Sequence, residues 1–216
     1  MLQGASPLQW NWAINQHFEL YHRFPHQAHT GGDAKIPTAI YYDNEGQARA
    51  FGAETAIEST QEQAREEQWH KSEWCVLLVK ASGQILTRCF LRFKLHFRPA
   101  NLPSSMISMD DRPLPPNKTA TQVLSDFLRY LLVCVREFIS EAHPNGAALW
   151  NSAKDTMEFV LTHPNGWGGP HQARMRQAAI AAELIPDNNG GHSRISFVTE
   201  GEGANRSNYH EALACS

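Results

Sequence analysis

The order of predicted elements in the last third of the chain restricts the fold more than any other feature. Residues 157–162 are β-rich and predict a strand, and Pro170 suits the first position of a helix that runs to about Leu184. Residues 187–191 are rich in Asn and Gly and close this helix, and residues 195–199 predict a second strand. Since a connection of this length joins parallel strands, the order predicts a parallel pair within an α/β fold.

Polar residues stand at the ends of both predicted strands. Thr162, His163 and Asn165 end the first strand, and Thr199 and Glu200 end the second. Parallel strands end at one edge of a sheet, and open α/β sheets bind ligands at that edge. Glu200 could position water or a hydrated cation beside a phosphate, or it could be a solvated residue that follows a strand. The residues alone leave both readings open.

The Gly-rich turn at residues 165–169 lies where α/β proteins often hold a phosphate. It lacks the spacing of Gly-x-Gly-x-x-Gly, and no Gly-x-x-x-x-Gly-Lys-Ser/Thr pattern occurs in the chain. Free N–H groups at the start of the following helix could still attract an anion. We interpret the glycines as residues that let the chain reverse sharply before the helix.

The first half of the chain predicts a hairpin followed by a polar helix. Residues 37–43 and 47–52 have strand composition, with a turn signal at residues 44–46 between them. Residues 54–71 are strongly polar and predict a helix on the surface.

Two segments of different character lead to the centre of the chain. Residues 75–98 are apolar and partly β-branched, with a possible turn at residues 82–83. Residues 99–118 hold five of the twelve prolines and show no period, so they predict a linker.

A long amphipathic helix is the clearest single element. Thr119 and Gln122 have the spacing of a capping box at its start. Residues 143–146, His-Pro-Asn-Gly, predict its end. Apolar residues recur at the spacing of one helical face, at Leu124, Phe127, Leu128, Leu131, Leu132, Val135, Phe138 and Ile139.

Charge and composition exclude several classes of protein. The formal net charge is −3, so a nucleic-acid partner has no electrostatic support. The longest apolar region, residues 123–139, is too polar for a membrane span. The amino terminus has no signal-peptide pattern, which predicts a cytoplasmic protein, and the four cysteines form no Cys-x-x-Cys pair, which favours free thiols in a reducing compartment.

Other clusters of reactive residues favour no further site. His22, His26 and His29, with His17 nearby, have no carboxylate or cysteine at ligand spacing, so we interpret them as exposed loop histidines and predict no metal site. Cys134 lies among the apolar residues of the long helix and reads as a small buried hydrophobe.

Six short segments, in order along the chain, carry a resemblance to a known family. They are Lys35–Asp43, Arg49–Glu54, Phe93–Pro99, Leu114–Ala120, Phe159–Trp167 and Ile195–Glu202. Together they resemble the nucleotide-binding domain of seventy-kilodalton heat-shock chaperones, and most nearly its divergent actin-like ATPase relatives in fungi. The resemblance implies a partial actin-like ATPase domain of the ribonuclease H-like kind, with a mixed sheet and flanking helices.

The resemblance also implies a site and its ligands. In the family, a lysine from the smaller subdomain and a glutamate after a strand flank the phosphates of ATP and its magnesium ion. Lys94 and Glu200 match these positions and are the catalytic candidates, while Thr162 and Thr199 are the cofactor-binding candidates. The segment Thr162–Pro164 resembles the one that couples nucleotide state to domain movement. Protein clients or co-chaperones are the partners implied.

The chain departs from the family in three places, which divides it into parts. Residues 1–34 and 203–216 match neither phosphate loop of the family, so the resemblance covers residues 35–202 and implies truncation at both ends. Residues 75–92 have no family counterpart. Their eighteen codons have a length compatible with a short unspliced intron, so we interpret them as a non-family insertion. Residues 99–118 remain the linker within the domain.

The missing loops predict weak nucleotide binding. Each hydrogen bond to a charged group is worth about 1.5–3 kcal/mol, so losing three or four costs at least ~5 kcal/mol. At about 1.4 kcal/mol per tenfold, ATP would bind more than about a thousandfold more weakly. The sequence therefore predicts little or no ATPase activity. The alternative is a non-catalytic interaction module or remnant that keeps part of the fold.

Overall fold

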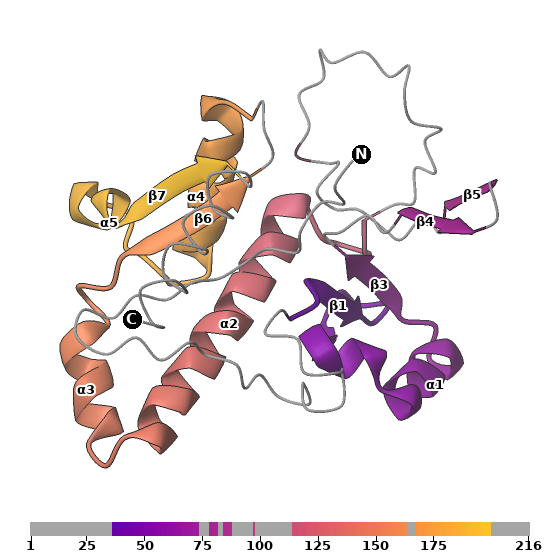
Figure 1. Cartoon of the computed structure of the whole chain (residues 1–216), viewed down its shortest axis with the longest axis horizontal. Helices are drawn as coiled ribbons and strands as arrows, with labels where there is room; N and C mark the ends of the chain where they lie inside the picture. Colours follow the sequence, from indigo (N-terminus) through magenta and orange to yellow (C-terminus); the bar gives the residue numbers. More distant parts are fainter. Residues whose placement is uncertain are drawn as a thin grey trace.

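A long helix, α2 (Ala120–Ala142), lies at the centre of the molecule, with an antiparallel sheet on one side and a parallel strand pair on the other (Figure 1). The computed structural model describes residues 36–73, 78–81, 84–87, 97, 114–163 and 167–199. The fold of these residues is mixed α/β. Their parallel and antiparallel strands form separate sheets, so the single mixed sheet that we expected is not seen among them.

The predicted hairpin is confirmed. Strand β1 (Ala39–Tyr42) pairs antiparallel with β2 (Ala48–Phe51), and Gly46 in the connecting turn has a φ of 81°, which favours glycine. The Asp43 carboxylate accepts hydrogen bonds from the backbone N–H of Glu45 and of Gln47, at 3.0 and 2.7 Å. These bonds fix the turn from within, as is typical of an Asp that precedes a turn.

The predicted helix at residues 54–71 is wrong at both ends. Helix α1 covers only Glu58–Glu66, after a short 3-10 helix, η2 (Gly52–Ala56). Gln68 then has a φ of 57°, which ends the helix, and His70–Glu73 form strand β3, which pairs with β1. The polar composition of this strand concealed it, because β3 is at the edge of the sheet and only Ser72 is buried.

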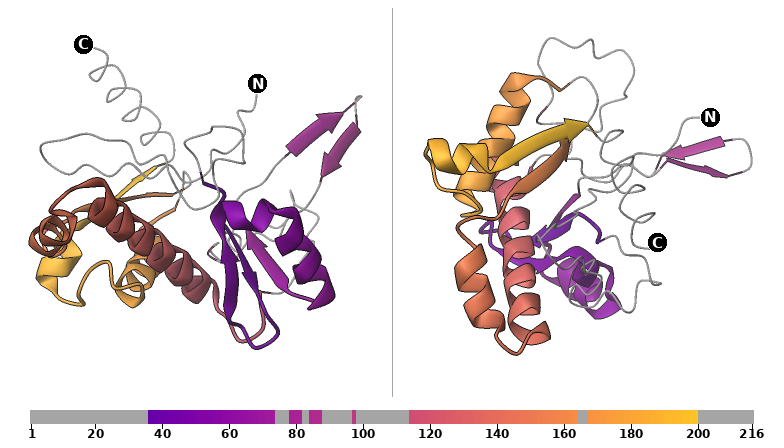
Figure 2. Two further views of the ribbon diagram at one scale, coloured as in Figure 1. Left: turned by 90° about the horizontal axis from the view of Figure 1, so that it is seen from below. Right: turned by 60° about the vertical axis from the view of Figure 1, so that its left-hand side comes forward.

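A second hairpin occurs in the segment that we interpret as an insertion. Strands β4 (Leu78–Ala81) and β5 (Gln84–Thr87) pair antiparallel, so the chain changes direction between them. The predicted turn at residues 82–83 lies outside the described residues. Figure 2 shows this hairpin extending away from the other described elements.

The start of α2 confirms the predicted capping box. The Gln122 N–H donates to Oγ1 of Thr119 at 3.3 Å, and the Thr119 N–H donates to Oε1 of Gln122 at 2.8 Å. The helix ends at Ala142, but a further helix that the sequence did not predict, α3 (Gly146–Ala153), begins at the last residue of the stop signal. None of the helices in the described ranges combines the length and the apolar character that a bilayer crossing requires.

The last third of the chain confirms the predicted strand, helix and strand. Strand β6 (Phe159–His163) and strand β7 (Ile195–Thr199) are parallel, and α4 (Gly169–Ala181) connects them. Two details of the prediction are corrected. Pro170 is the second residue of α4 and not the first. The segment that we expected only to close the helix starts a short helix of its own, α5 (Asn189–Ser193), which Asn188 caps.

One hydrophobic core joins both sides of the molecule. Figure 1 places β1 and β2 on one side of α2 and the β6–α4–β7 unit on the other. Side chains from both faces of α2 belong to this core. Its largest buried side chains are Tyr42, Phe97, Phe127, Ile40, Leu124, Leu128, Leu131, Leu161, Met175 and Val123. The long helix therefore supports the strand pair whose end carries the candidate site.

Candidate functional site

The carboxyl ends of β6 and β7 bring three predicted site residues together. His163 pairs with Thr199 across the two strands, and Thr162 pairs with Val198. Thr162 and His163 are buried and Thr199 is half-buried. The parallel register thus places a hydroxyl from each strand, and an imidazole, at one edge of the sheet.

Aromatic rings form a wall at this edge. The ring of Trp167 stacks on His163 at 6.4 Å and on His171 at 5.1 Å, measured between ring centroids. Phe97 is fully buried, and its ring stacks on that of Trp167 with 5.9 Å between the centroids. Phe197 on β7 contacts His163 at 6.5 Å. No periodic pattern in the sequence predicts this wall, because its members come from separate segments.

Polar groups in the first turn of α4 form hydrogen bonds within the turn and to His163. The N–H of Gly168 donates to Nδ1 of His171 at 3.3 Å, and the His171 N–H donates back to the Gly168 carbonyl at 3.0 Å. The side-chain amide nitrogen of Gln172 lies 3.1 Å from Nε2 of His163. A helix start binds an anion through N–H groups that lack partners. The bonds inside this turn reduce its capacity to hold a phosphate.

The glycines at the start of α4 are not needed for steric reasons. Gly168 has a φ of −104°, and a Cβ added to Gly168 or Gly169 would meet no atom within 4 Å. Our interpretation that glycine is needed here to reverse the chain is therefore wrong for these two positions. The rest of that turn, residues 164–166, lies outside the described residues.

The remaining site predictions fall outside the described part of the chain. These residues are Lys94, Glu200 and Asn165, together with the histidines at positions 17, 22, 26 and 29. Glu200 directly follows Thr199, and Lys94 precedes the buried Phe97 by three positions. Within the described ranges, no group of three or more His, Cys, Asp or Glu side chains could hold a metal ion.

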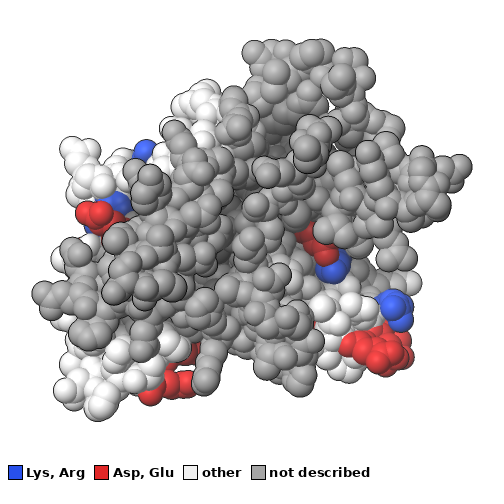
Figure 3. All heavy atoms as spheres, viewed as in Figure 1, with Lys and Arg blue, Asp and Glu red and all other residues white. Residues whose placement is uncertain are grey.

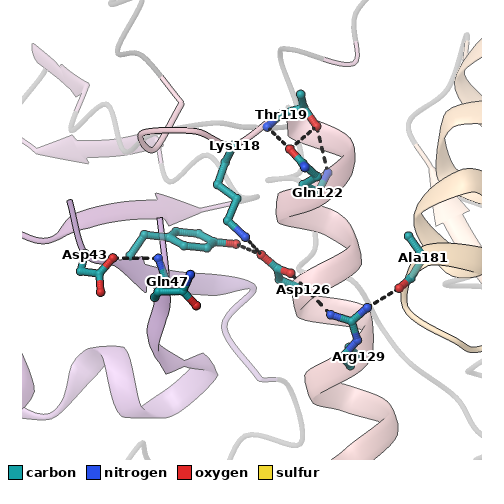
Figure 4. A network of polar contacts seen from close by, with 9 residues as sticks. Asp43, Gln47, Lys118, Thr119, Gln122, Asp126, Arg129 and Ala181 are labelled. Carbon is teal, nitrogen blue, oxygen red and sulfur yellow. Dashed lines mark hydrogen bonds and ion pairs between the residues drawn. The ribbon is translucent and has the colours of Figure 1, made fainter. Parts of the chain in front are cut away.

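A polar network connects the two sides of the molecule through α2 (Figure 4). Asp126 accepts a hydrogen bond from the Tyr42 hydroxyl at 2.9 Å and forms an ion pair with Lys118 at 2.7 Å. Arg129, one turn further along α2, lies 3.9 Å from Asp126 and donates to the carbonyl of Ala181 at the end of α4. The sequence predicted none of these contacts, since Asp126 only interrupted an apolar run.

The groups of this network stabilise the fold. Burial, together with the Asp126 carboxylate, raises the pKa of Tyr42 above its ordinary value, so the phenol stays neutral and donates its proton to the hydrogen bond. Lys118 also lies 5.2 Å from the centre of the Tyr42 ring, a favourable cation–π distance. These contacts fix the position of β1 against the first two turns of α2.

Cys134 is buried, as predicted, with 3% of its surface exposed. Burial raises the pKa of its thiol to about 11, so the group is protonated at neutral pH. Because the thiolate is the reactive form, Cys134 is a core residue and not a nucleophile.

The described edge fits a nucleotide only in part. Two threonine hydroxyls and an imidazole can hydrogen-bond to sugar or phosphate oxygens, and the aromatic wall can pack against a ring. Magnesium needs carboxylate or phosphate oxygens, and the described residues of this edge supply no such set. These residues therefore do not by themselves fit magnesium-bound ATP.

Comparison with protein-family models, with curated proteins and with solved structures finds no match.

Proposed function

We propose that the chain contains part of an actin-like ATPase domain of the kind found in seventy-kilodalton heat-shock chaperones, and that it hydrolyses little or no ATP by itself. One observation carries the proposal: the parallel β6–α4–β7 unit brings Thr162, His163 and Thr199 to a common edge. Ligands of open α/β sheets bind at such an edge. The ordered resemblance of six segments supplies the choice of ATP among possible ligands.

The residues have distinct roles in this proposal. Thr162 and Thr199 stand at the carboxyl ends of β6 and β7, and their hydroxyls are the proposed hydrogen-bond donors to the nucleotide. Glu200, next after Thr199, and Lys94 supply the charges beside the phosphates and magnesium. The proposed location is the cytoplasm, and protein clients or co-chaperones are the proposed partners.

The expected affinity for ATP is low. At the start of α4, the N–H groups of Gly168, His171 and Gln172 already have hydrogen-bond partners within the turn. The chain also contains no sequence that matches the Gly-rich phosphate loops of the family. Without those loops, the phosphates lose several charge-assisted hydrogen bonds, each worth about 1.5–3 kcal/mol. If complete domains bind at micromolar concentration, this chain binds at millimolar concentration or more weakly.

Calorimetry with magnesium-bound ATP tests the proposal. We expect a dissociation constant in the millimolar range and no phosphate release above the rate without protein. The matched control is the same titration with Thr199→Ala, which should weaken even this binding because it removes a hydroxyl from the edge. A micromolar dissociation constant, or steady turnover, would contradict the expected weak binding. Binding that Thr199→Ala leaves unchanged would place the nucleotide elsewhere.

A further inference from the structure

An open groove of about 810 Å³ lies beside the antiparallel sheet, between β2, η2 and α1. It belongs to the opposite side of α2 from the β6–β7 edge, so it is separate from the proposed nucleotide site (Figure 1). The charged, polar and large apolar side chains that matter for binding in this groove are Arg49, Glu54, Ile57, Glu58, Gln63 and Trp69.

Among the described side chains that line the groove, the single arginine is already paired, so their remaining charge is negative. Arg49 contacts Asp43 through Nη2 at 2.6 Å and through Nε at 2.7 Å. Burial alone would raise the pKa of Asp43, but the hydrogen bond from Gln47 and the guanidinium of Arg49 hold it below its ordinary value. Asp43 is therefore ionised at neutral pH and neutralises Arg49. The described carboxylates that line the groove are Glu54, whose Oε2 accepts a hydrogen bond from the Phe51 N–H at 3.2 Å, and the exposed Glu58, and these two make the groove acidic.

The surface of α1 extends this negative charge. The helix contains three glutamates and one arginine, and all four are exposed. Figure 3 shows acidic side chains gathered at the lower right, where Figure 1 places α1. A positively charged segment that entered the groove would thus meet favourable potential both inside it and along its border.

An aromatic and an apolar side chain complete the groove. The Nε1 of Trp69 donates to Glu67 at 3.0 Å, and the Trp69 ring contacts Tyr41 at 6.2 Å, so the ring is held in place. Trp is the best aromatic partner for a cation. Ile57 offers an apolar surface to the methylene stem of a lysine or arginine side chain.

We propose that this groove binds a basic segment of a partner protein, in which lysine or arginine side chains reach Glu54, Glu58 and Trp69. Charge complementarity selects this occupant over an acidic or purely apolar segment. The inference does not depend on ATP binding, because the groove and the β6–β7 edge share no residue.

Fluorescence anisotropy with labelled synthetic peptides tests this inference on the full chain. The probe is a peptide of about twelve residues in which lysine alternates with alanine, and its matched control carries glutamate in place of every lysine. We expect the basic peptide to bind and the acidic one not to bind. Binding should weaken as salt rises to about 0.15 M, where the Debye length is about 8 Å.

A pair of charge reversals locates the binding. Glu58→Lys reverses a charge in the groove, whereas Glu158→Lys makes the same change at an exposed position before β6. We expect Glu58→Lys to weaken binding about fivefold, as for an exposed ion pair turned into repulsion, and Glu158→Lys to change it less than twofold. Glu58→Gln serves as the milder variant if circular dichroism shows that the lysine perturbs α1.

Three outcomes would overturn the inference. They are equal binding of both peptides, equal effects of the two reversals, and no binding of the basic peptide at low salt and submillimolar concentration. The first two would indicate that general surface charge or nonspecific adsorption accounts for binding, and the third that the groove takes no basic segment.

Discussion

Replacing Phe127 with alanine is expected to lower the free energy of unfolding by about 3–5 kcal/mol. Phe127 has 0% of its surface exposed and lies in the first half of α2, in the core that joins the two sides of the molecule. Its ring also contacts Tyr130 at 6.0 Å. Truncation removes apolar contacts and leaves a cavity, and the surrounding side chains can fill that cavity only in part.

The loss would be a large share of the stability of a domain, which is typically about 5–15 kcal/mol. Val133→Ala on the same helix is the matched control, since Val133 is 36% exposed. Alanine also has the higher helix propensity, so we expect a change of less than about 1 kcal/mol for the control. Urea unfolding followed by circular dichroism measures both. Similar losses for the two variants would contradict a core that passes through Phe127.

Gly191→Ala is expected to destabilise the protein by about 2–3 kcal/mol, because the new side chain has no room. A Cβ at this position would stand 2.0 Å from the carbonyl oxygen of Pro186, which is a backbone atom that cannot move alone. The backbone must therefore shift, and the shift reaches β7 within four residues. Arg194, which bonds to the Gly191 carbonyl and also holds the Met157 carbonyl at 2.7 Å, would be displaced with it.

The neighbouring glycine supplies a close control. A Cβ at Gly190 would meet only Oδ1 of Asn188, at 3.4 Å, and Gly190 is exposed. Gly→Ala at a compatible position stabilises by about 0.4–1 kcal/mol, so Gly190→Ala should be neutral or slightly stabilising. Thermal and urea unfolding of the two variants give the comparison. If Gly191→Ala is as stable as Gly190→Ala, the turn before β7 is not as close-packed as described.

Local signals predicted the elements whose stabilising contacts are also local. The capping box of Thr119 and Gln122 and the apolar face of α2 are spaced within one helix, and both occur as predicted. The parallel β6–β7 pair followed from chain order, because a crossover connection leaves little choice of direction.

Elements that depend on distant partners were missed or misplaced. Strand β3 is polar and continues a helical pattern, and only its pairing with β1 makes it a strand. Helices α3 and α5 are short and begin at signals that normally end a helix. A stop signal shows where one helix ends, but it does not say whether the next residues start another.

Of the candidate site, the sequence predicted only the residues at the ends of the two strands. His163 and Thr199 meet because they are paired in two parallel strands, and Thr162 directly precedes His163 on β6. Trp167, Phe97 and the internal bonds of the α4 turn arise from tertiary contacts that the sequence pattern does not reveal.

The most direct test of the central claim is a titration of the isotope-labelled chain with magnesium-bound ATP, followed by the NMR signals of individual backbone amides. We expect the largest shifts at Thr162, His163, Thr199 and the first turn of α4, growing up to millimolar ATP without saturating at micromolar concentration. Shifts confined to other residues, or no shifts at all, would contradict the claim that this edge is the wall of a nucleotide site. Saturation at micromolar ATP would contradict the claim that the chain binds ATP only weakly.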